Sequence, residues 1–207
     1  MKLNIVDILP ASLRRNAVVI RLEAGERLFR KGDRAESTYL IKQGRFQEIC
    51  YPEIGKVAVL QILQTGEAIG ESSIQTGVYH STAIAQTDAE IIAYPNYILR
   101  ETLSSSSITL DAVLDSLTNK INELQTRLEW RNIAVADRRV LSYLEHKQQK
   151  AAPDNESNRS FALDLPLQEV AAELGFVPGT LSRALTKLEA ERKITREKNQ
   201  ITLHDVA

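Results

Sequence analysis

Cysteine is almost absent from the 207-residue sequence, which contains only Cys50. One thiol cannot form an internal disulfide, and it supplies too few ligands for a cysteine-bound iron–sulfur cluster or a structural zinc site. The chain also lacks an apolar run of about 18 residues, and its first residues contain no uninterrupted apolar stretch of the signal-peptide type. We therefore expect a cytoplasmic protein without a membrane segment.

Catalytic signatures are missing as well. The sequence has no G-x-S-x-G, H-E-x-x-H or phosphate-binding-loop motif, and its three histidines are His80, His146 and His204. The charge is nearly balanced, with 26 Lys and Arg against 27 Asp and Glu, so any basic surface must be local. These features predict a protein that is not an enzyme.

Glycine is concentrated in one part of the chain, where seven of the nine glycines lie between Gly25 and Gly77. The same part holds short runs of strand-forming residues, such as STYLI (37–41), FQEIC (46–50) and VAVLQIL (57–63). Short strands separated by frequent turn residues are typical of an antiparallel sandwich or barrel. We expect this β-domain to span about residues 18–95, with Pro95 ending the sheet.

A leucine-rich seam follows in a region without glycine. Its members are spaced alternately by four and three residues, as in a heptad repeat: Leu110, Leu114, Leu117, Ile121, Leu124 and Leu128. So narrow an apolar stripe predicts a helix near residues 108–132 that pairs with a second copy of the chain. A helix that lies on its own β-domain is the alternative.

The carboxy-terminal third predicts a helix-turn-helix with a wing. Asp137 is a candidate cap for a first helix, residues 149–160 are a predicted loop, and 161–165 a predicted strand. Two short helical segments follow, PLQEVAAEL and PGTLSRALTKLEAER, in which Ala171 and Gly175 would permit close crossing. A hairpin around Lys198-Asn199 closes the chain.

The second of these helical segments has one polar stripe at helical spacing. Its members are candidate DNA-contacting residues: Gly179, Thr180, Ser182, Arg183, Thr186 and Lys187. Arg183 can donate two hydrogen bonds to guanine, and residues 176–200 hold six basic against three acidic residues. Pro178 would start the helix, and Gly179 would let its backbone approach the major groove. An ordinary helical bundle with solvated polar residues is the alternative.

A second constellation lies within the predicted β-domain. The candidate effector-binding residues are Gly70, Glu71, His80, Ser81 and Thr82. A glycine turn with amides, hydroxyls and a carboxylate can hold an anionic group together with a sugar hydroxyl. Solvated turn residues at strand ends are the alternative, and a haem-binding role for His80 also stays open.

The order of these parts resembles the cyclic-AMP receptor protein and fumarate-nitrate regulator (CRP/FNR) superfamily. The resemblance rests on G-E-x-L-F-x-x-G-D at 25–33, G-E at 70–71 with HSTAIA at 80–85, and T-L-S-R at 180–183. It implies an α+β chain with a cyclic-nucleotide-binding-like β-roll, or jelly roll, in residues 1–107. A dimerisation helix and hinge would follow in 108–136, and a winged helix-turn-helix in 137–207.

The resemblance further implies a homodimeric transcription regulator that binds a palindromic DNA site and contacts RNA polymerase. His80 stands where the family has the arginine that pairs with the cyclic phosphate, so we expect weak or absent cyclic-AMP binding. Since Cys50 stands alone, the subfamily with an iron–sulfur cluster is excluded. The effector stays unidentified, and activity without one is also open. A signalling module whose carboxy-terminal domain contacts a protein partner is the alternative function.

Overall fold

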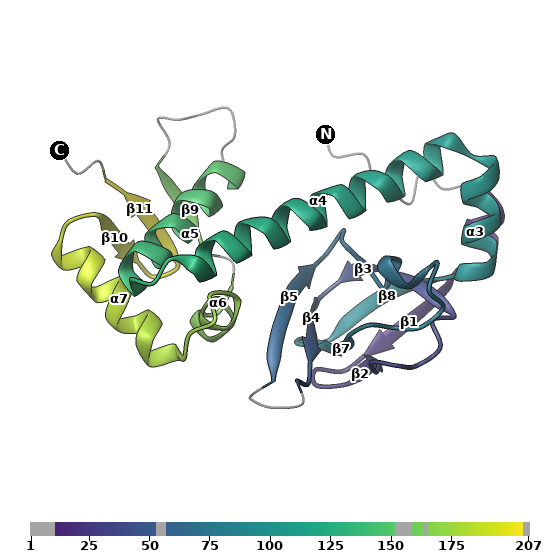
Figure 1. The fold of residues 1–207 in the computed structure, drawn as a ribbon, viewed down its shortest axis with the longest axis horizontal. Helices are drawn as coiled ribbons and strands as arrows, with labels where there is room; N and C mark the ends of the chain where they lie inside the picture. Colours follow the sequence, from purple (N-terminus) through teal and green to yellow (C-terminus); the bar gives the residue numbers. More distant parts are fainter. Residues whose placement is uncertain (1–10, 53–56, 152–158, 164, 205–207) are drawn as a thin grey trace. The chain divides into compact units, whose positions relative to one another are not determined.

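The computed structural model describes residues 11–52, 57–151, 159–163 and 165–204. The chain divides into two compact units, Met1–Asn122 and Glu123–Ala207, each with its own apolar core. Helix α4, Ser107–Asn132, contains the boundary between them (Figure 1). It matches the helix predicted from the leucine-rich seam.

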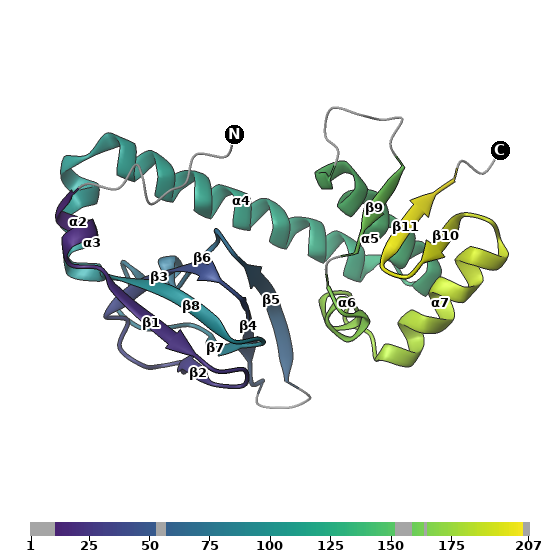
Figure 2. The same cartoon turned by 180° about the vertical axis from the view of Figure 1, so that it is seen from behind.

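Two antiparallel four-stranded sheets form the amino-terminal unit (Figure 1 and Figure 2). The first has the strand order β1-β8-β3-β6 and the second β2-β7-β4-β5. The strands are β1 Val18–Leu22, β2 Arg27–Phe29, β3 Ser37–Gln43, β4 Arg45–Cys50, β5 Ala58–Gln64, β6 Ala68–Ile69, β7 Thr82–Ala85 and β8 Ala89–Pro95. This is the predicted β-roll, with Pro95 as the last residue of β8.

The interior of the roll is filled by the apolar side chains that alternate along these strands. Phe46, Ile69 and Ile91 are fully buried there, and the rings of Phe29 and Tyr79 stack with their centroids 3.7 Å apart. Alternation with a period of two places these residues on the face that each sheet turns toward the other. The candidate effector residues therefore lie on a rigid scaffold.

The first sheet also packs on helices with its outer face. α2, Ala11–Arg15, and α3, Asn96–Ser105, contribute to this layer together with the start of α4. The outer cluster consists of Leu13, Leu40, Ile74, Tyr94, Ile98 and Leu99, with Val113 of α4 packed against it. The amino-terminal unit thus has two apolar layers, one inside the roll and one beneath the helices.

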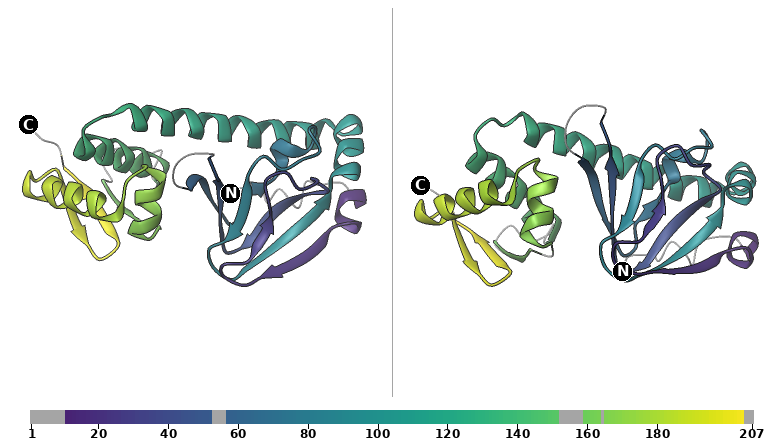
Figure 3. Two further views of the ribbon diagram at one scale, coloured as in Figure 1. Left: turned by 60° about the horizontal axis from the view of Figure 1, so that its bottom comes forward. Right: turned by 90° about the horizontal axis from the view of Figure 1, so that it is seen from below.

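The carboxy-terminal unit combines three helices with a three-stranded sheet (Figure 3). Its helices are α5 Ala136–Ala151, α6 Leu167–Glu173 and α7 Pro178–Ala190, and its strands are β9 Ser160–Ala162, β10 Ile194–Glu197 and β11 Gln200–Leu203. The sheet order is β10-β11-β9, and Glu197 pairs with Gln200 across the predicted hairpin turn. The winged helix-turn-helix is confirmed.

Three local expectations need correction. α5 begins at Ala136, so Asp137 lies in the first turn of the helix and is not its cap. Gly175 has a φ of 71°, and a Cβ there would meet only the side chain of Arg131. The left-handed backbone at this position therefore explains the glycine, and a close crossing of helices does not. The predicted loop begins later, because α5 extends to Ala151; residues 152–158 and 164 lie outside the described residues.

Candidate nucleic-acid interface and effector pocket

α7 is held in place by a buried face. Leu181, Ala184, Leu185 and Leu188 are each at most 5 % exposed, and α7 packs on both α5 and α6. Val177 is the residue before the helix and Pro178 opens it, where a missing amide proton costs nothing. The turn between α6 and α7 is fixed by Phe176, whose amide donates to the carbonyl of Ala171 at 2.8 Å.

The other face of α7 carries all six predicted DNA-contacting residues. Gly179, Ser182, Arg183, Thr186 and Lys187 are exposed, and Thr180 is half-buried. Arg183 donates to the hydroxyl of Thr180 at 3.4 Å, and no carboxylate is recorded beside Arg183 among the described residues. The guanidinium is therefore available for a planar acceptor pair such as the guanine edge.

Lys187 lies on the same face but has an acidic partner. Its ammonium group is 2.7 Å from the carboxylate of Asp137 and 3.7 Å from that of Glu191. The hydrogen bond from Lys187 lowers the pKa of Asp137, and the same bond raises the pKa of Lys187. A phosphate contact by Lys187 would exchange this exposed ion pair for a new one.

The base of the helix-turn-helix is anchored by a buried carboxylate. Glu173 of α6 accepts hydrogen bonds from Arg127 at 2.8 Å and from the Tyr143 hydroxyl at 3.0 Å, and its side chain is 4 % exposed. Trp130 packs edge-on against the rings of Tyr143 and His146. These contacts join the end of α4 to the core that supports α7.

The candidate effector residues of the amino-terminal unit fall into two groups by their contacts. Gly70 has a φ of 85° and opens the 3₁₀ turn η1, Glu71–Ser73. Glu71 is buried and faces α4, where the Lys120 ammonium lies 2.6 Å from its carboxylate and the Ser116 hydroxyl donates to it at 3.3 Å. Lys120 also donates to the carbonyl of Ala68 at 2.8 Å.

The second group faces other partners. Ser81 is buried and donates to the carboxylate of Glu48 on β4 at 2.9 Å. Thr82 accepts a hydrogen bond from the amide of Lys31 at 3.0 Å. His80 is exposed, and its ring nitrogen lies 2.9 Å from the hydroxyl of Thr76. The structure therefore gives Glu71 and Ser81 different protein partners and does not join all five residues in one network.

The leucine-rich seam of α4 is largely exposed in the single chain. Leu110, Leu114, Ile121, Leu124 and Leu128 are 40 %, 51 %, 56 %, 45 % and 62 % exposed, and Leu117 is half-buried. So much apolar surface along one helix is typical of a partner-binding face. None of the helices in the described parts is long and apolar enough to cross a membrane.

Comparisons with known proteins cover both units. A family model for the cyclic nucleotide-binding domain matches residues 19–106, and one for the Crp-like helix-turn-helix domain matches residues 138–207. The chain belongs to the CRP/FNR superfamily. It is therefore a transcription regulator with a DNA-binding helix-turn-helix, in a family of regulators and not of enzymes.

Individual relatives agree with this assignment. The transcriptional activator protein FnrA of Stutzerimonas stutzeri is 23 % identical over 188 residues, which are 89 % of this chain and 75 % of that protein. The global nitrogen regulator of Synechococcus elongatus is 25 % identical over 190 residues, which are 88 % and 84 % of the two chains. A solved structure of a CooA mutant from Carboxydothermus hydrogenoformans has a TM-score of 0.78 at 18 % identity and covers 99 % of this chain and 93 % of that one. None of these matches supports the alternative of a module with a protein partner.

A cyclic nucleotide, which the CRP/FNR fold implies, does not fit the side chains of this roll. Glu48 places a buried carboxylate at the hydroxyl of Ser81, where a cyclic phosphate would bring a second negative charge. Glu71, the carboxylate among the candidate effector residues, already has the ammonium of Lys120 and the hydroxyl of Ser116 as partners. Binding of the phosphate beside Ser81 would bury two like charges together.

Glu48, Ser116 and Lys120 were missed as site residues in the sequence. Glu48 had a visible signal, because it shares a strand face with the core residue Phe46 and is a charged residue on an apolar face. Lys120 follows Ser116 by four residues, which places both on one side of α4. Their partners lie 33 to 52 residues away in the chain, so a local sequence pattern cannot predict these contacts.

Proposed function

We propose that this CRP/FNR regulator is a homodimer that reads a two-fold palindromic DNA site through α7. The observation that carries the proposal is the two-sided character of α7, whose buried face is fully packed while Arg183 and Ser182 are exposed beside each other. A helix so presented after a tight turn is the recognition helix of a helix-turn-helix. The wing β10–β11 supplies additional basic residues near it.

Homodimerisation is supported by the exposed seam of α4. Two copies of this helix in a left-handed coiled coil would cover Leu114, Ile121 and Leu128 together. Two-fold symmetry in the protein implies a palindromic site with half-sites about one turn of DNA, roughly 34 Å, apart. Such a regulator acts in the cytoplasm, and contact with RNA polymerase is proposed because relatives are described as transcriptional activators.

Selection of bound DNA from a random library tests the proposal with the purified full chain and no added effector. We expect enrichment of a palindrome, which would mean that the free protein is competent to bind. Enrichment only after a cellular extract of small molecules is added would mean that an effector is required. Failure of both selections would contradict the DNA-binding proposal.

The substitution Arg183→Ala tests the assigned helix. We expect the enriched site to be bound about 1–3 kcal/mol more weakly, with relaxed choice at one base pair of each half-site. Arg138→Ala is the matched control, because Arg138 is an exposed arginine on α5 outside the α7 stripe. Equal DNA affinity of the Arg183→Ala and Arg138→Ala variants would show that α7 is not the reading helix.

A further inference from the structure

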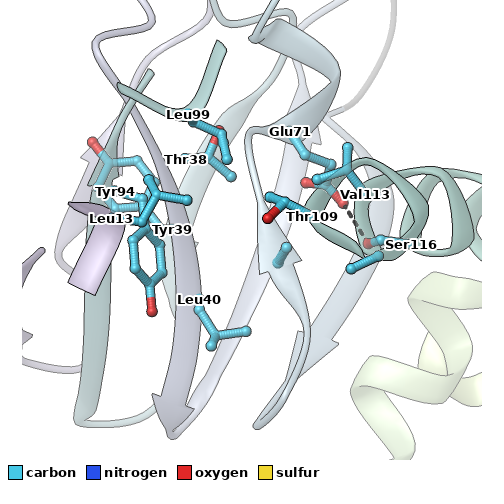
Figure 4. A pocket seen from close by; sticks show the side chains of 12 residues that line it. Leu13, Thr38, Tyr39, Leu40, Glu71, Tyr94, Leu99, Thr109, Val113 and Ser116 are labelled. Carbon is cyan, nitrogen blue, oxygen red and sulfur yellow. Dashed lines mark hydrogen bonds between the residues drawn. The ribbon is translucent and has the colours of Figure 1, made fainter. Parts of the chain in front are cut away.

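A pocket lies beneath the first turns of α4, within the amino-terminal unit (Figure 4). β3, β6 and β8 form one side, α2 and α3 close it, and four residues of α4 form the other side: Thr109, Ala112, Val113 and Ser116. One buried water needs about 10–15 Å³, so a cavity of about 60 Å³ has room for a ligand of a few heavy atoms.

This pocket lies mainly in the layer outside the roll, and Tyr39 is the lining residue that also packs against the interior cluster. Leu13, Leu40, Tyr94, Leu99 and Val113 line it, and all five belong to the apolar layer between the first sheet and the helices. The hydroxyl of Ser81, in contrast, is bound by Glu48 on β4, a strand of the second sheet. Of the five candidate effector residues, Glu71 lines this pocket, whereas Gly70, His80, Ser81 and Thr82 do not.

Four polar side chains around the pocket already have protein partners: Thr38, Thr109, Ser116 and Glu71. Thr38 donates to Asn96 at 2.8 Å, Thr109 donates to Ser106 at 3.0 Å, and Ser116 donates to Glu71. The one carboxylate in the lining, that of Glu71, is neutralised by Lys120 (Figure 4 shows its contact with Ser116). The pocket therefore offers mainly carbon atoms, which favour an uncharged apolar ligand.

The pocket and the leucine-rich seam lie on different sides of the same helix. Thr109, Ala112, Val113 and Ser116 follow the i, i+3, i+4, i+7 spacing of one helical face, and Lys120 continues it. Leu110, Leu114 and Ile121 lie on an exposed face beside it. A ligand in the pocket would pack against the first of these faces. It would therefore change how α4, which carries the leucine-rich seam, packs on the first sheet.

We infer that this pocket binds a small, uncharged apolar molecule, such as an arene or a short hydrocarbon, and that this ligand class is the effector of the regulator. The site itself rests only on the geometry of the amino-terminal unit; the effector role rests on the proposed dimeric function. Binding stabilises the packing of α4 on the roll, and the ion pair between Glu71 and Lys120 adjoins the ligand.

Benzene is a suitable probe for the purified full chain, with cyclic AMP as the comparison ligand. We expect benzene to raise the unfolding temperature by about 3–6 °C when its concentration is ten times its dissociation constant. In spectra of methyl-labelled protein, we expect nuclear Overhauser contacts from benzene to Leu13, Leu40 and Val113. No unfolding shift with benzene, or contacts only to other methyl groups, would overturn the inference.

Ala112→Leu fills the pocket from α4 and is expected to abolish the benzene-induced shift. Asn119→Leu is the matched control, because Asn119 is exposed on the same helix and does not line the pocket, so this variant should keep the shift. Equal shifts in both variants would also overturn the inference. If Ala112→Leu does not fold, the contacts measured in the unaltered protein decide the question. Since none of these measurements uses DNA, their failure would leave the DNA-binding proposal intact.

Discussion

Gly175 and Gly179 lie four positions apart in the helix-turn-helix, and they differ in whether the backbone requires glycine. Gly175 ends α6 in the left-handed region, with a φ of 71°, which side chains with a Cβ adopt only under strain. Gly179 lies in the first turn of α7, where a Cβ would meet nothing within 4 Å. Gly175 therefore serves the fold, whereas Gly179 weakens its helix and invites a functional explanation.

The two glycines can be separated by substitution with alanine. We expect Gly175→Ala to lower the free energy of unfolding by about 1 kcal/mol, because the strained backbone is retained. Gly179→Ala should raise it by roughly 0.5–1 kcal/mol, since alanine is the better helix former, and should weaken DNA binding because the added methyl group keeps the backbone from the groove. Urea denaturation and DNA titration check these effects. A Gly179→Ala variant with unchanged DNA affinity would refute close backbone approach.

At the scale of elements, the exposed seam of α4 gives the most direct test of the dimer. In the proposed dimer, Ile121 would face its own copy across a two-fold axis, so Ile121→Glu would bury a carboxylate there at a cost of several kcal/mol. We expect the dissociation constant of the dimer to rise about 100-fold or more, measured by analytical ultracentrifugation. Asn119→Glu adds the same charge at an exposed position off the seam and should leave the dimer unchanged. An Ile121→Glu variant that stays dimeric at the same concentrations would place the interface elsewhere.

Elements with a strong periodic pattern were predictable from the sequence, and their exact ends were less so. The spacing of Leu110 to Leu128 predicted α4. The helical spacing of Leu181 and Leu185 predicted the buried face of α7, with Ser182 on the opposite face. The start of α5 was placed two residues late, because Asp137 is a good cap by residue type but lies in the first turn of a helix that begins at Ala136. The contact of Asp137 with Lys187 joins residues 50 positions apart, which no local signal reveals.

The surroundings of the candidate effector residues were less predictable, because their chemistry depends on pairs brought together by the fold. Gly70 and Glu71 were recognised from the turn, but nothing local indicates that Lys120 neutralises Glu71. The apolar pocket is hidden for the same reason, since its lining comes from three helices, the turn η1 and three strands of the first sheet. Sequence patterns predict which side chains are buried, and only the packing shows where space is left between them.

The whole molecule has just three histidines to make its stability depend on pH near neutrality. His80 and His204 are exposed, whereas His146 is half-buried against the ring of Trp130. Burial lowers the pKa of His146, and the nearby ammonium groups of Lys150 and Lys147 lower it further, while Glu123 and Glu173 act in the opposite direction. The folded chain therefore resists protonation of this imidazole more than the unfolded chain does.

The sign of the resulting pH dependence follows from proton linkage. Well above about pH 6.5, the ordinary pKa of histidine, His146 is neutral in both states. As the pH falls through this value, the unfolded chain takes up the proton first, so the folded state loses stability. We expect the free energy of unfolding to decrease between pH 7 and pH 5, and His146→Gln to reduce that decrease. Denaturant titrations at fixed pH values measure it, with His80→Gln as the control because the His80 side chain is exposed. If His146→Gln retains the full pH dependence, other groups than this buried imidazole couple the stability of the regulator to protons.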